Sequence, residues 1–230
     1  PTRRSSDLNY EMQMCRTGKI NGVNYQDSLF RGIEVDGDSV DSDKIQFERA
    51  LVNSQISNIL KQAGVDTSSI TKDCTFTVDP YSYEITVDGV DEETKVLMQN
   101  ALNVGNNGKN LYKHIYYCST QDGCESSQVT EESKMKYEAY HQVCSYTGYG
   151  LDKLEEKNGT YYTESGENIL DLVDSAVESS GKVPKEFKQQ MKNWIHDLVS
   201  TISTRGWNNV PDMTLSILYG KSGLKDMNQL

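Results

Sequence analysis

The sequence predicts an α+β fold in which several helices cover a small, mainly antiparallel sheet and make up most of the structure. Two short segments alternate apolar with polar residues, Phe76 and Val78 in the first and Ile85 and Val87 in the second. This period of two is typical of half-buried strands. Longer segments repeat apolar residues at helical spacing and outnumber the strands. Because strands and helices do not alternate regularly, the pattern favours α+β over a parallel α/β architecture.

The stretch from Cys74 to Ile115 predicts one local unit, a pair of strands followed by two helices. Asp79-Pro80 should turn the chain between the strands, because proline fixes φ and cannot donate a ladder hydrogen bond. Asp91 is expected to cap a helix that ends at Gly105, and Asn110 to begin the next one. The apolar stripe of the first helix is expected to be Val96, Leu97, Ala101 and Leu102.

Further helices are predicted over residues 44–63, 131–146, 167–178 and 184–204, with Thr130 as a cap and Pro184 as an opening residue. Asn158-Gly159 predicts a turn before a short strand at 160–162, and residues 213–219 predict a last strand. The final helix carries an apolar face of the kind that packs on a core. Its members are Phe187, Met191, Trp194, Ile195, Leu198, Val199 and Ile202.

The chain divides by composition into four parts. Residues 1–8, PTRRSSDL, read like a translated sequencing adapter, and we expect an adapter-derived scar. Residues 9–43 are rich in Asn, Gly and Asp and predict a flexible arm or linker. Residues 44–220 predict a single α+β domain, with a subdivision near 148–152 left open, and 221–230 predict a frayed tail. With such a scar, we expect the true start of the protein to lie outside the sequence. The sequence therefore does not indicate whether the protein is cytoplasmic or exported.

The composition excludes some partners and favours others. A net charge of −11 argues against nucleic acid, whose phosphates require clustered Lys and Arg. No apolar run approaches the roughly 20 residues of a membrane-spanning helix. Fourteen tyrosines against four phenylalanines favour half-buried packing or contact surfaces, so a protein partner is expected.

Known catalytic and ligand-binding motifs are missing from the sequence. There is no His-Glu-x-x-His, Walker loop, nucleophile elbow or dinucleotide fingerprint. The acidic cluster at Asp36–Asp43 does not fit a calcium loop. The Gly105–Lys109 segment lacks the spacing of a phosphate loop and is explained as a helix end followed by a helix start. No cofactor is therefore expected, and an enzyme is not favoured.

One set of residues has the chemistry of a zinc site. His114 and Cys118 are four residues apart on one predicted helix, and His141 and Cys144 are three apart on another. If these helices pack together, the four side chains supply the nitrogen and sulfur ligands of a tetrahedral Zn²⁺. Buried free cysteines and packed histidines explain the same residues, and a Cys118–Cys124 or Cys118–Cys144 disulfide competes if the protein is exported.

Two segments, Phe76–Val87 (FTVDPYSYEITV) and Asn107–Ile115 (NGKNLYKHI), resemble an uncharacterised protein family of Gram-positive bacteria, a domain of unknown function. The resemblance implies a bacterial source and, with it, an inert glycosylation sequon at Asn158-Gly159-Thr160. It implies no activity and no catalytic residues.

The leading hypothesis is a non-catalytic bacterial domain that makes protein contacts, in the cell envelope, in motility or in the cytosol. One alternative is a hydrolase with a tyrosine-lined cleft between the segments Tyr112–Tyr117 and Tyr137–Tyr149. The other is a zinc-stabilised structural domain. A deep pocket holding His114 or His141 would favour the enzyme, whereas an exposed apolar patch would favour contacts.

Overall fold

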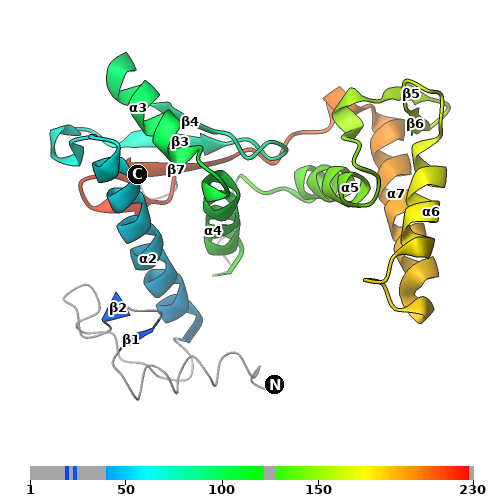
Figure 1. Ribbon diagram of the computed structural model, residues 1–230, viewed down its shortest axis with the longest axis horizontal. Coiled ribbons are helices and arrows are strands. Elements are labelled where there is room, and N and C mark those ends of the chain that lie inside the picture. Colours follow the sequence, from blue (N-terminus) through cyan, green and yellow to red (C-terminus); the bar gives the residue numbers. More distant parts are fainter. Residues whose placement is uncertain (1–18, 21–22, 25–39, 122–127, 228–230) are drawn as a thin grey trace.

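The computed structural model describes residues 19–20, 23–24, 40–121 and 128–227, and it confirms the helix-dominated α+β fold (Figure 1). The predicted scar at residues 1–8 and most of the predicted arm at 9–43 lie outside these residues. Within the described part there are six α-helices: α2 (Val40–Gln62), α3 (Glu92–Leu102), α4 (Asn107–Gln121), α5 (Glu131–Thr147), α6 (Ile169–Ser179) and α7 (Lys188–Arg205). No described helix combines the length and apolar character that crossing a membrane requires.

The main sheet has four antiparallel strands in the order β4–β3–β7–β8. The strands are β3 (Cys74–Val78), β4 (Ile85–Asp88), β7 (Leu215–Gly220) and β8 (Gly223–Lys225). Phe76 pairs with Val87 on one side and with Ile217 on the other, as the period-two pattern predicts. Buried and less buried residues alternate along β3 and β4, so one face of this sheet is covered, and α2, α3 and α4 contribute to its core.

Two short hairpins complete the strands. β5 (Glu155–Lys157) and β6 (Thr160–Tyr162) flank the predicted turn, in which Asn158 and Gly159 both have positive φ, as a tight hairpin requires. Near the N-terminus, β1 (Lys19–Ile20) pairs with β2 (Val23–Asn24). The chain after Gly220 differs from the predicted frayed tail, because β8 pairs with β7 and buries Leu224.

The apolar residues form two separate cores. The first lies under the main sheet and draws on α2, α3, α4 and β3, β4, β7 and β8; we call this part the sheet lobe. The second draws on α5, α6, α7 and β6, from Ala139 to Val210, and we call it the helical lobe. The lobes lie side by side, and the chain passes between them twice (Figure 1). The open subdivision at 148–152 falls just after the end of α5. That helix itself contributes to both cores, because Tyr137 packs against the first core and Met135 and Ala139 belong to the second.

Local capping explains where the helices begin. The side chain of Asp91 accepts a hydrogen bond from the Thr94 amide at α3, as predicted. Thr130 and Ser133 form a reciprocal capping box at α5, and Gly148 ends that helix in the left-handed region. A short 3-10 turn, Lys185–Phe187, precedes α7. Other short 3-10 turns are Thr67–Ser69, Leu151–Lys153 and Trp207–Asn209.

Candidate functional site

The predicted zinc ligands lie on α4 and α5 in different surroundings. His114 is buried in the sheet lobe. Burial, with a smaller contribution from the charge of Arg49, lowers its pKa to about 4, so the ring is neutral at pH 7. His141 is half-buried at the lobe junction, where its Nε2 lies 2.7 Å from the carbonyl oxygen of Pro80. Burial lowers the pKa of His141 as well. A metal on His141 would therefore have to bind through Nδ1 or displace this hydrogen bond.

Cys144 is a half-buried free thiol, whereas the side chain of Cys118 lies outside the described residues, as does Cys124. Among the described side chains, no three His, Cys, Asp or Glu residues form a group that could hold a metal ion. The four-ligand zinc site stays a prediction, because one of its members is not described.

The predicted tyrosine-lined cleft is occupied by packed rings where its two segments meet. The rings of Tyr112 and Tyr137 stack with a centroid distance of 5.3 Å, and the Tyr83 and Tyr137 hydroxyls are hydrogen-bonded at 2.9 Å. The Tyr112 hydroxyl donates to the carbonyl oxygen of Met213 at 2.7 Å. Burial raises the pKa of both Tyr112 and Tyr137, so their phenols stay uncharged. These tyrosines hold α4, α5 and the β3–β4 turn together.

A lysine network forms the second part of this junction. Lys136 on α5 is only 2% exposed, and its Nζ lies 2.8 Å from the Val210 carbonyl oxygen and 2.7 Å from Oδ1 of Asp212. The same Nζ lies 4.4 Å from the ring centroid of Trp207, a cation–π distance. Tyr81, from the β3–β4 turn, donates its hydroxyl to Asp212 at 2.5 Å. The network thus joins α5 to the segment around Val210 and Asp212, where the chain leaves the helical lobe. It also joins α5 to the β3–β4 turn of the sheet lobe.

The Gly105–Lys109 segment lines a polar pocket of about 570 Å³ together with Ser82, Tyr83 and Glu84. A Cβ added to Gly108 would lie 1.9 Å from the carbonyl oxygen of Tyr83. Close packing of α4 against the β3–β4 turn therefore requires this glycine, independently of any ligand. The described lining combines the carboxylate of Glu84 with the ammonium group of Lys109, so it offers a phosphate no net positive charge.

A groove between α2 and α4, about 380 Å³ in volume, is lined largely by aliphatic residues. Four buried aliphatic residues form its floor, and two half-buried ones, Val52 and Ile59, lie beside them. The floor residues are Ile56, Ile85, Leu102 and Leu111. Neither His114 nor His141 lines this groove or the Gly105–Lys109 pocket, so the geometry that would have favoured a hydrolase is not found at these two places.

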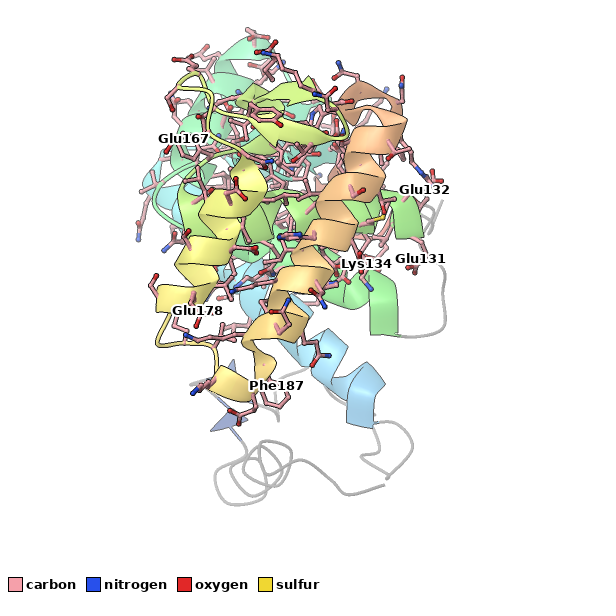
Figure 2. The ribbon with its side chains drawn as sticks, turned by 90° about the vertical axis from the view of Figure 1, so that its right-hand side faces the viewer. Glu131, Glu132, Lys134, Glu167, Glu178 and Phe187 are labelled. Carbon is pink, nitrogen blue, oxygen red and sulfur yellow. The ribbon has the colours of Figure 1, made fainter. Side chains whose placement is uncertain are left out.

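The helical lobe exposes an apolar edge that the sequence placed in the core. Phe187 is 52% exposed and Trp194 is 38% exposed, although both belong to the apolar face predicted for the last helix. Ile195, Val199 and Ile202 of that face are buried. Trp194 and Ile195 are about 100° apart around the helix axis, so an apolar face this wide extends beyond the core. Phe187 and Glu178 lie at one end of the α6–α7 hairpin, and Glu167 lies at the other (Figure 2).

The same kind of difference occurs on α3. Met98 and Leu102 are the buried residues of this helix, whereas Val96 and Leu97, predicted in its apolar stripe, are exposed. Val104, just after the helix, is also exposed. The prediction of the stripe was wrong at these two positions, because Met98 and Leu102 are one turn apart and together define the face that meets the sheet.

The fold and these surfaces define a two-lobed α+β domain that exposes several large apolar side chains, and its described part contains none of the catalytic motifs considered above. The chain belongs to the family described as "Domain of unknown function (DUF4885)", whose model matches residues 2–230. The match includes seven of the eight residues predicted to be a scar.

A relative in Bacillus subtilis (strain 168), "Uncharacterized protein YbdO", is 29% identical over 227 residues. The alignment covers 98% of this chain and 56% of that relative, so the chain spans little more than half the relative's length. No solved structure matches. These findings confirm the resemblance to an uncharacterised family of Gram-positive bacteria.

Proposed function

We propose that the chain is a non-catalytic module that binds another polypeptide through the α7 edge, defined as Phe187, Met191 and Trp194. The observation that carries the proposal is the exposure of Phe187, in the 3-10 turn that leads into α7, and of Trp194 on α7 itself. The three residues follow each other at spacings of four and three, so they lie along one side of the helix.

Aromatic residues and methionine are enriched at protein interfaces, and tryptophan is frequent among the residues that dominate binding energy. Covering the exposed part of each ring contributes on the order of 2 kcal/mol. Two such rings supply a large share of the free energy of a micromolar complex, which is about 8 kcal/mol.

The charge around the α7 edge indicates the character of the partner. Between Glu178 and Trp194 the chain carries four lysines and two glutamates, although the whole chain has a net charge of −11. Lys188 and Lys192 both contact Glu178, at its carbonyl and its carboxylate respectively. Neither Lys182 nor Lys185 makes an ion pair within the described part of the chain. An acidic partner surface therefore complements this end of the molecule.

In-cell photo-crosslinking tests the proposal. A photo-reactive phenylalanine analogue at position 187 or 194 should form covalent adducts with the same polypeptide. The matched control is the analogue at Gln189, an exposed residue about 140° around α7 from Trp194. The absence of adducts at both test positions, or the same adducts at Gln189, would refute the proposal.

A further inference from the structure

We propose that the groove between α2 and α4 binds an uncharged, apolar segment of a polypeptide in extended conformation. This site is distinct from the α7 edge, because it lies in the sheet lobe. Its volume of about 380 Å³ is within the range of ligand-binding clefts and holds roughly two or three apolar side chains.

Among the described residues that line the groove none is charged, although charged residues make up 25% of the chain. Every polar residue in it is an amide: Gln55 and Asn58 on the α2 wall, and Asn107 and Asn110 on the α4 wall. Each pair is three residues apart and so lies on one side of its helix. A charged ligand segment would lose the hydration of its charge in this groove without gaining an opposite charge as a partner. An uncharged segment has no charge to desolvate.

The four amide side chains make no hydrogen bond within the described part of the chain. A side-chain amide donates and accepts like the peptide group itself, so amides on two facing walls can pair with both edges of an extended backbone. The apolar floor of the groove then receives those side chains of the bound segment that point between the two amide-bearing walls.

The same lobe already contains an example of this recognition. Asn103, the residue that caps the C-terminal end of α3, accepts a hydrogen bond from the Ile85 amide at 2.7 Å and donates one to the Ile85 carbonyl oxygen at 2.9 Å. One turn away, Gln99 accepts from the Val87 amide at 2.9 Å. Two amide side chains, one on α3 and one at its C-cap, thus bind the edge of strand β4, beside which the described part of the chain places no further strand.

A selection from a displayed library of random heptapeptides tests the proposal on the full chain. The enriched peptides should be uncharged and apolar. A variant with Asn58→Asp and Asn110→Asp, both at exposed positions, should bind them at least tenfold more weakly. The matched control, Asn100→Asp with Gln190→Glu, adds the same charge at exposed positions outside the groove and should bind within twofold of the unaltered chain. Thermal unfolding of both variants checks that they fold alike.

Enrichment of charged peptides, equal binding by both double variants, or no enrichment would overturn the proposal. A photo-crosslinker placed at position 58 shows whether some other polypeptide segment occupies the groove. A crosslink to residues 1–39 of the same chain, or to a second copy, would also overturn it. Binding of the selected peptides to a variant with Phe187→Ser and Trp194→Ser should be unchanged, so this test can fail or succeed independently of the α7 edge.

Discussion

Replacing Lys136 by methionine should loosen the junction between the lobes. Methionine keeps most of the apolar stem, so the change mainly removes the ammonium group. That group contacts the Val210 carbonyl oxygen, Asp212 and the Trp207 ring, and its side chain is 2% exposed. Its removal leaves the carbonyl oxygen of Val210, a residue that is 3% exposed, without this donor.

The size of the effect follows from these contacts. A hydrogen bond to a charged group contributes about 1.5–3 kcal/mol, and breaking a fully buried ion pair costs about 3–5 kcal/mol. The side chain of Asp212 is 49% exposed and can be rehydrated, so the upper range does not apply. We expect Lys136→Met to reduce the free energy of unfolding by about 2 kcal/mol.

Urea unfolding measured by tryptophan fluorescence is a suitable assay, because both tryptophans belong to the helical lobe and Trp207 lies at the junction. Lys134→Met, on the same helix but about 200° away from Lys136, is the matched control and should change stability by less than about 0.5 kcal/mol. A loss below about 0.5 kcal/mol for Lys136→Met, or an equal loss for both variants, would refute the role given to the network.

Three further predictions concern glycine, histidine and metal. Gly108→Ala should lower the free energy of unfolding in urea by about 2 kcal/mol, because the new Cβ would overlap the Tyr83 carbonyl oxygen. In the control, Gly181→Ala, the Cβ meets no atom within 4 Å, so stability should not change. Equal effects of the two substitutions would contradict this explanation. The pKa of His114 is lowered to about 4 in the folded chain. Between about pH 6.5 and 4 the unfolded chain therefore binds a proton at this histidine that the folded chain does not bind. The free energy of unfolding should fall by about 3 kcal/mol as the pH drops through this range. His114→Gln should remove that part of the pH dependence, and an unchanged pH profile of the unfolding midpoint would show that the histidine is not responsible. The zinc hypothesis predicts stoichiometric zinc in the purified protein and its loss in Cys118→Ser; no metal in either protein would remove the hypothesis.

Local signals in the sequence predicted the local structure well. The strands β3 and β4 follow from alternation, and the caps at Asp91 and Thr130 follow from side chains that bond their own backbone. These features depend on residues a few positions apart. They could be predicted without knowing what packs against them.

The features that depend on distant contacts were less predictable. Phe187 and Trp194 fit the apolar face of α7, and only the extent of the neighbouring helices decides that they are exposed. The strand β8 has a single buried residue, Leu224, and exists because β7 offers it an edge. The amide side chains of the groove come from α2 and α4, which are far apart in the sequence. Because these side chains are uncharged, no charge pattern in the sequence marks them. Such sites require the tertiary fold.

Co-purification from the cells in which the gene is native tests the proposed function most directly. The account predicts that a polypeptide partner copurifies with the unaltered chain and is depleted at least tenfold, by quantitative mass spectrometry, when Phe187 and Trp194 are both changed to serine. A control with Gln189 and Asn193 changed to serine, about 140° and 100° around α7 from Trp194, should retain it. Retention of every partner by the Phe187→Ser, Trp194→Ser variant, folded and as stable as the control, would contradict the claim that the α7 edge is a binding surface.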